Sequence, residues 1–202
     1  NFRVLAVVAS SPEVPDTAET VTFTPLVSDI SAEGREVSIS IVACIDPGID
    51  RGEEISCEGS ASKQEITYNS GNPVDLNVTL GATLFTGEMP SVNVTLPSNI
   101  LSERSAIERF NGVDYLVIFS FSSSGSEILK SFKRVNVSER TSVNQNPTLG
   151  VVSSISLSSS EQTLSVTGAT GKETFNFINL LGEVEQGEEV LYLSWFTSNG
   201  EI

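Results

Sequence analysis

Apolar and polar residues alternate with a period of two along most of the chain, which is the pattern of half-buried β-strands. The clearest run is Val37–Ala43, where valine and isoleucine fall on one face and serine on the other. Tyr115–Phe121 begins apolar on both faces, which is typical of a central strand covered on both sides. A short turn around Gly125 joins it to the next run and predicts a hairpin. Further strands are predicted at Val21–Thr24, Val74–Leu80, Val92–Leu96 and Ile128–Val137.

One segment departs from this alternation and predicts a short helix. Ser98 is a suitable N-cap for a helix over Asn99–Phe110, and the Asn-Gly pair at 111–112 is a helix stop. The apolar residues of the segment fall on roughly one helical face: Ile100, Ile107 and Phe110. We expect this helix to cross between two strands of the first module.

The chain turns polar over Ser138–Pro147, which has the composition of a linker between domains. We therefore expect two modules, over residues 1–143 and 147–202. Short alternating runs also follow the linker, at Ser154–Leu157, Leu164–Val166, Phe175–Phe177 and Val190–Phe196. Short, regularly spaced strands separated by turn residues predict an all-β fold of tandem immunoglobulin-like β-sandwiches.

The second of these sandwiches is predicted to be incomplete. An immunoglobulin-like sandwich needs about seven strands and roughly 100 residues, whereas 56 residues follow Asn146. Three explanations are open: the natural chain continues past Ile202, the remainder is disordered, or another protein supplies the missing strands. Continuation is favoured because Ser198–Ile202 has the composition of a turn that enters a further strand.

The charge of the chain bears on its partners. It contains 11 lysine and arginine residues against 26 aspartate and glutamate residues, a net charge of −15. Such a surface repels nucleic-acid phosphates and anionic lipids, so neither is an expected partner. No run approaches the roughly 18 apolar residues that a membrane-spanning helix requires.

The two cysteines, Cys44 and Cys57, bracket a segment rich in turn-forming residues. A pair that closes such a loop suits a disulfide bond, which implies an oxidising compartment. The alternative is a pair of buried free thiols. A zinc site is disfavoured, because zinc takes four ligands and the chain contains no histidine.

We do not expect an enzyme. The absence of histidine excludes Ser-His-Asp and Cys-His mechanisms. Ser60 and Lys63 match the Ser-x-x-Lys signature of penicillin-recognising enzymes, but the accompanying Ser-Asp-Asn and Lys-Thr-Gly elements are missing. A pair of catalytic carboxylates remains open, although nothing in the sequence singles one out.

The strongest site-like cluster lies in the loop between the cysteines and consists of Asp46, Asp50, Glu53 and Glu54, with Glu58 just beyond. Carboxylates in a turn-rich loop can bind calcium, so Asp46, Asp50 and Glu53 form a candidate calcium site. The spacing does not match an EF-hand loop. The competing interpretation is a solvated loop without a metal.

Lys130, Lys133 and Arg134 form the only basic cluster of the chain. Strand alternation places Lys130 and Arg134 on one face and Lys133 on the other. Charges of this kind on an edge strand block unwanted pairing between sheets, and we favour this role over a ligand site.

Several segments resemble a known family. The opening Phe2–Pro15, the strand Val21–Val27, the Cys-bounded loop and the Asn-Gln-Asn-Pro run at 144–147 resemble bacterial cell-surface lipoproteins with tandem Ig-like or PKD-like domains. Leu193–Ile202 looks like the third strand of a following module of that type. The resemblance implies a mature protein tethered by a lipidated cysteine upstream of Asn1, which would be its only contact with a membrane.

These features together predict a non-catalytic structural or adhesive binding module of an exported envelope protein. The expected location is the cell surface or the periplasm, with an anchor at the outer membrane, and the expected partners are other envelope or surface proteins. No cofactor is expected apart from the candidate calcium ion. The alternative is an accessory module of a carbohydrate-active enzyme, which a catalytic domain beyond Ile202 would favour.

Overall fold

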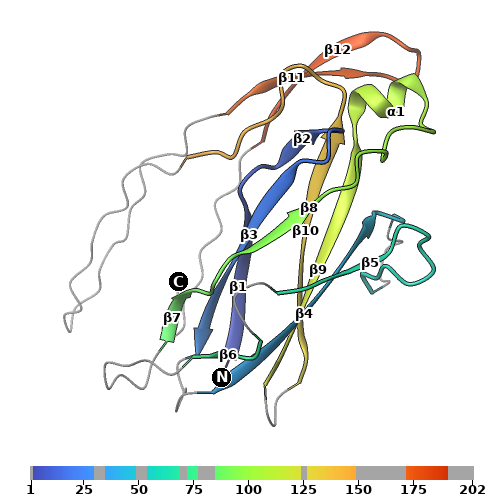
Figure 1. Ribbon diagram of the computed structural model, residues 1–202. Coiled ribbons are helices and arrows are strands. Elements are labelled where there is room, and N and C mark those ends of the chain that lie inside the picture. Colours follow the sequence, from blue (N-terminus) through green and yellow to red (C-terminus); the bar gives the residue numbers. More distant parts are fainter. Residues whose placement is uncertain are drawn as a thin grey trace, which may run out of the picture.

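The computed structural model describes residues 2–29, 35–48, 54–68, 72–76, 85–123, 127–148 and 172–190. Figure 1 shows long strands that run along the body of the molecule and a separate hairpin at one end. The described strands form a four-stranded sheet, a six-stranded sheet and a two-stranded sheet. The all-β prediction is therefore confirmed.

The four-stranded sheet is organised around its longest strand, β3 (Thr20–Asp29). One edge of β3 pairs with β1 (Phe2–Ala9), and the other pairs in succession with β7 (Phe85–Glu88) and β8 (Val92–Thr95). All of these pairings are antiparallel.

The six-stranded sheet has β9 (Val113–Ser123) at its centre, between β4 (Glu36–Ile45) and β10 (Leu129–Ser138). The short strands β5 (Gln64–Ile66) and β6 (Val74–Asp75) pair with β4. The remaining strand, β2 (Glu13–Pro15), pairs parallel with the end of β10. This division of the strands between two sheets follows the immunoglobulin pattern. The predicted hairpin is confirmed by the antiparallel pairing of β9 with β10.

The main core lies between the two large sheets and is built from the alternating apolar positions. Phe23 of β3 packs against Phe119 of β9 with ring centroids 5.8 Å apart, and Phe121 lies 6.2 Å from Phe119. All three rings are fully buried. Val37, Ile39 and Ile41 on β4 join the same core, as their alternation with serine predicts.

A second, smaller core covers the outer face of the six-stranded sheet. Leu116 and Ile118 of β9 are buried there with Cys44 and Cys57. The partly buried Val42 and Ile55 pack against this cluster. Because β9 is covered on both sides, the prediction of a central strand apolar on both faces is confirmed.

The crossover helix is shorter than the sequence predicts. Helix α1 spans Ala106–Asn111 and is capped by Ser105, so the predicted start at Ser98 is wrong. Ser105 and Glu108 form a capping box, which fixes the start of the helix. The preceding turn is held by Asp16, whose carboxylate accepts hydrogen bonds from the backbone N–H groups of Ile100 (3.2 Å) and Leu101 (3.1 Å).

The predicted end of the helix is confirmed. Gly112 follows α1 with φ +90°, a backbone conformation that favours glycine. Its N–H donates to the backbone oxygen of Glu108 at 2.7 Å. The helix connects β8 of one sheet to β9 of the other, as expected of a crossover.

The two-stranded sheet consists of β11 (Thr174–Ile178) and β12 (Val184–Glu188). It lies at the end of the molecule that carries α1 (Figure 1). The prediction of a strand at Phe175–Phe177 is confirmed, whereas β12 lacks apolar alternation and was not predicted. The predicted strands at Ser154–Leu157 and Leu164–Val166, most of Val74–Leu80 and most of Val190–Phe196 lie outside the described residues.

Candidate binding cleft

The predicted disulfide bond is present. Cys44 near the end of β4 is bonded to Cys57, and their Cα atoms are 5.9 Å apart. Both residues are buried, and neither described cysteine is free. The bond ties the loop that follows β4 over the outer face of β9, where Leu116 packs against it.

The described acidic residues in and just after this loop are paired with separate cations. Asp46 accepts a hydrogen bond from Arg134, Glu54 from Lys130 and Glu58 from Lys63. The hydrogen bond and the charge of Lys130 lower the pKa of Glu54, and Lys63 lowers the pKa of Glu58 in the same way.

The candidate calcium site stays a prediction. Of its three proposed ligands, Asp46 is described, and its carboxylate is engaged by Arg134 and by the backbone N–H of Gly48 at 3.0 Å. Asp50 and Glu53 lie outside the described residues. Within the part of the chain that is described, no group of three or more acidic or cysteine side chains could hold a metal ion.

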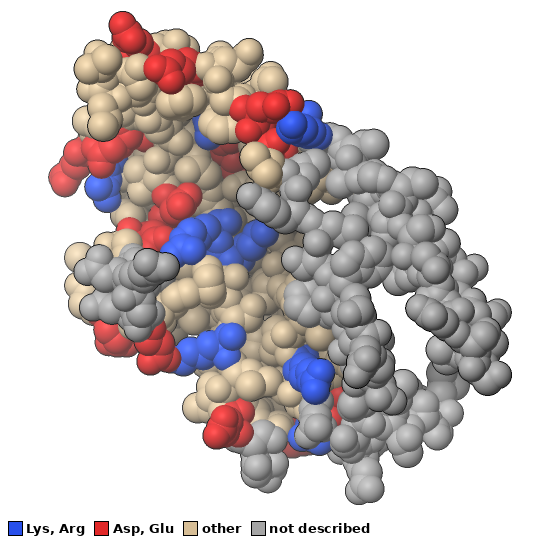
Figure 2. Space-filling model, turned by 180° about the vertical axis from the view of Figure 1, so that it is seen from behind, with Lys and Arg blue, Asp and Glu red and all other residues tan. Residues whose placement is uncertain are grey.

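The basic residues of β10 are arranged as alternation predicts. Lys130 and Arg134 lie on the face of β10 that looks toward the Cys-bounded loop, because each pairs with one of its carboxylates. Between them lies the half-exposed ring of Phe132, with the Arg134 guanidinium carbon 5.1 Å from the ring centroid. Figure 2 shows one face of the molecule, on which basic side chains lie beside acidic ones.

A second polar cluster holds the predicted linker against the first module. Glu13 of β2 is buried, and its carboxylate accepts hydrogen bonds from Ser138 and from the backbone N–H of Asn144 at 2.8 Å. Arg140 Nη2 lies 2.8 Å from the same carboxylate. Asn146 donates to the backbone oxygen of Ala9 at 2.7 Å. The composition of Ser138–Pro147 does not indicate this anchoring, because the partners are far away in sequence.

The β11–β12 hairpin is attached to this linker and to α1 by side chains. The amide of Asn111 donates to the backbone oxygen of Ile178 (2.8 Å) and accepts from its N–H (2.7 Å). Asn144 donates to Glu189 at 3.1 Å, and the backbone N–H of Gln145 donates to Glu173 at 3.1 Å. The hairpin is therefore fixed at both ends of β11.

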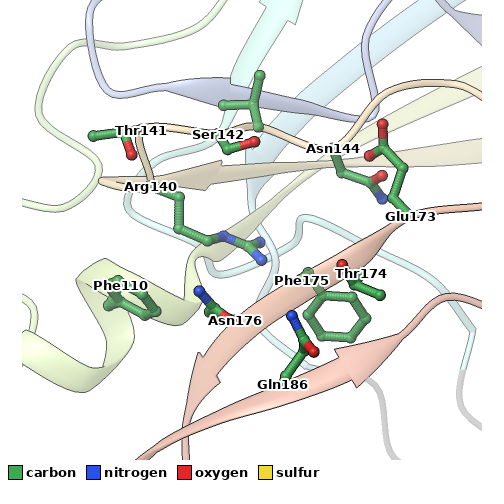
Figure 3. Close-up of a pocket in the computed structure, with 11 residues that line it drawn as sticks. Phe110, Arg140, Thr141, Ser142, Asn144, Glu173, Thr174, Phe175, Asn176 and Gln186 are labelled. Atoms are coloured by element: carbon green, nitrogen blue, oxygen red, sulfur yellow. The ribbon is translucent and has the colours of Figure 1, made fainter.

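A cleft of about 390 Å³ lies between these attachments, among the linker, the end of α1 and the hairpin. Figure 3 shows the side chains that line it, with the rings of Phe110 and Phe175 on opposite sides of the Arg140 guanidinium. The other lining residues are mostly hydroxyl, amide and carboxylate groups: Thr141, Ser142, Val143, Asn144, Glu173, Thr174, Asn176 and Gln186. Such a lining suits a polar ligand that also has an apolar part.

Two buried polar atoms of the lining residues have unmet hydrogen-bonding capacity. Arg140 Nε and Asn144 Oδ1 are buried and have no partner within the described part of the chain. Buried polar atoms are normally hydrogen-bonded. The sequence alone did not point to this cleft, whose walls come from three separate segments.

Comparisons with known proteins do not assign the chain to a family. No protein-family description matches it, and no curated protein matches it. One similar solved structure is Spo0M, the sporulation control protein from Bacillus subtilis, with 14% sequence identity and a TM-score of 0.32. The similarity covers 69% of this chain and 50% of that one. A TM-score this low carries no argument about fold or function.

Proposed function

We propose that this protein is a non-catalytic structural or adhesive binding module of an exported envelope protein, and that it contacts other envelope or surface proteins. The disulfide bond between Cys44 and Cys57 supports export, because such bonds persist in oxidising compartments. An upstream lipid anchor and a location at the cell surface or in the periplasm remain part of this proposal. The described residues include no helix long and apolar enough to cross a membrane.

The exposure of apolar side chains at the tip of the β11–β12 hairpin is the observation that supports a binding role. Leu180 and Leu181 are 98% and 83% exposed, and Val184 beside them is 63% exposed. Leaving three large apolar side chains in water costs roughly 25 cal/mol per Å² of apolar surface, compared with burying them. A cluster of this kind on the surface is typical of a site for another protein.

The loop that carries the two leucines is held in one conformation by Asn179. Its side-chain oxygen accepts from the backbone N–H groups of Leu181 and Glu183, both at 2.9 Å. Its side-chain nitrogen donates to Glu185 at 2.6 Å. Since these bonds already hold the backbone of the loop, little backbone entropy is lost when a partner buries the leucines.

The acidic surroundings indicate the kind of partner. Glu183 and Glu185 lie beside the leucines in the sequence and in the hairpin. An apolar tip with acidic neighbours fits an apolar pocket with basic side chains at its rim, because charges across an interface are arranged to be complementary.

A capture experiment with matched variants tests the proposal. We expect the wild-type chain to retain specific proteins from a detergent-solubilised envelope, and the Leu180→Ser/Leu181→Ser variant to lose them. Ile128→Ser is the control, because it removes a side chain that is 63% exposed and lies outside the hairpin. Equal capture by all three proteins would overturn the role of the tip. Fractionation that places the protein in the cytosol would overturn the proposed location.

The lining of the cleft favours a second candidate, an accessory carbohydrate-binding module. Amide and guanidinium groups next to the exposed ring of Phe175 can hydrogen-bond and contact a sugar. Calorimetric titration with neutral cell-wall oligosaccharides tests this. Heat of binding that is lost in Asn176→Ala and retained in Ile128→Ser would favour the carbohydrate function.

A further inference from the structure

The hydrogen-bond register of the hairpin determines which backbone groups face the cleft. Asn179 donates to Glu183 and Glu189 donates to Glu173 through their backbones, both at 2.9 Å. In an antiparallel ladder, hydrogen-bonded and non-hydrogen-bonded pairs alternate. The odd-numbered residues of β11 therefore bond to β12, whereas Thr174, Asn176 and Ile178 direct their backbone N–H and C=O groups to the other edge.

The contact with α1 confirms this assignment. At Ile178 both outward backbone groups are bonded to the side-chain amide of Asn111. An amide that both donates to a backbone oxygen and accepts from a backbone N–H occupies the place of a paired strand. The next two outward positions, Asn176 and Thr174, line the cleft. No residue of the described part of the chain hydrogen-bonds to their backbone groups on this edge.

We infer that this edge of β11 binds an extended peptide segment of a partner protein by strand addition, a conclusion that rests on the proposed binding function. Backbone groups two residues apart on a strand repeat every 6.4–6.8 Å or so, which is the repeat of another extended peptide. A peptide in the cleft would supply an acceptor and a donor for each open position, as in other complexes formed at sheet edges.

The walls of the cleft indicate which peptide fits. Phe110 and Phe175 offer apolar contacts, and Arg140 is already neutralised by the buried Glu13. Glu173 adds negative charge, and the whole chain carries −15. The segment therefore combines an apolar side chain that contacts one of the two rings with neutral or basic flanking residues.

Peptides selected from a random dodecapeptide library on the folded chain are the probe. We expect the selected peptides to slow amide hydrogen exchange at Thr174 and Asn176. N-methylation of alternate peptide residues should weaken binding at least tenfold in one register and have little effect in the other, because only one set of N–H groups faces β11.

A pair of proline variants completes the test. Asn176→Pro removes an outward N–H without removing a bond to β12, and we expect at least a tenfold loss of peptide affinity. Glu188→Pro is the control, because its N–H faces the edge of β12 away from β11, where proline is tolerated. Exchange of the sandwich amides verifies that both variants are folded.

Three results would overturn the inference. The first is that the selected peptides protect amides elsewhere and not those of Thr174 and Asn176. The second is that the Asn176→Pro variant binds the peptides with normal affinity. The third is that an oligosaccharide, but no peptide, protects the amides of Thr174 and Asn176. Any of these results, combined with envelope capture that depends on Leu180 and Leu181, would overturn strand addition and leave the proposed function standing. If the peptide results hold but envelope capture does not depend on Leu180 and Leu181, the proposed role of the hairpin tip is overturned instead.

Discussion

The β-sandwich and the β11–β12 hairpin are stabilised in different ways. The sandwich buries complete side chains between its sheets, and Phe23, Phe119 and Phe121 are fully covered. In residues 172–190, by contrast, no side chain is buried, and Phe175 and Phe177 contact each other at the surface. The hairpin keeps its position through hydrogen bonds from Asn111 and the linker.

This difference bears on the proposed binding function. A two-stranded hairpin is marginally stable by itself in water, so its order depends on the few contacts that attach it to the sandwich. Elements of low local stability are the ones that proteins use for binding and for adjustment to a partner. The sandwich thus provides a rigid base, and the hairpin presents the cleft and the apolar tip.

The largest expected effect is on the sandwich core. Phe119→Ala should lower the free energy of unfolding by about 3–5 kcal/mol, because it leaves a cavity between two packed rings. Phe132→Ala is the matched control. That side chain is 42% exposed, so its removal should lower the free energy of unfolding much less. Equilibrium unfolding in guanidinium chloride measures both. Equal losses of unfolding free energy in the two variants would contradict the prediction that the burial of the ring determines the loss.

The disulfide bond should have the next largest effect. A Cys44→Ala/Cys57→Ala variant should lose roughly 3 kcal/mol, because the bond closes a loop with a sequence separation of 13. Equilibrium unfolding gives the value, and reduced wild-type protein should behave like the variant. Thiol titration of the denatured, unreduced protein should find no free sulfhydryl, and finding two would contradict the bond.

A smaller, local effect is expected at the attachment of the hairpin. Asn111→Ala removes both hydrogen bonds to Ile178, which corresponds to about 1–3 kcal/mol. Amide exchange should become faster in residues 172–190 and stay unchanged in β4 and β9. Asn99→Ala is the control, because that exposed side chain lies in the turn before α1. Faster exchange throughout the sandwich would show that the two regions are not separable.

The mildest effect concerns alkaline pH and is confined to the sandwich. Burial raises the pKa of Tyr68 from 10.0 to about 12, and its hydroxyl donates to the backbone oxygen of Pro90. The neutral phenol is favoured in the folded state. The contribution of Tyr68 to the free energy of unfolding is therefore complete below pH 10 and is lost as the pH rises toward 12. Unfolding measured across this range should show a decline that Tyr68→Phe reduces, and an identical decline in both would contradict it.

The features that depend on local pattern could be predicted from the amino-acid sequence. Alternation along Val37–Ala43 and Tyr115–Phe121 predicts β4 and β9, because a strand covered on one face must place its apolar side chains on every second residue. The apolar outer face of β9 correctly indicated a second covering layer, and the spacing of Cys44 and Cys57 in a turn-rich segment correctly indicated their bond.

The start of α1 and the position of the cleft depend on contacts between distant parts of the chain and could not be predicted from local pattern. Asp16 holds the turn at Ile100 from 84 residues away, and Glu13 holds Asn144 from 131 residues away. β12 has no apolar alternation, so its pairing with β11 and not its own composition makes it a strand. Periodicity reports the environment of each residue along one strand, whereas a cleft is formed by segments that meet only after the sheets have packed.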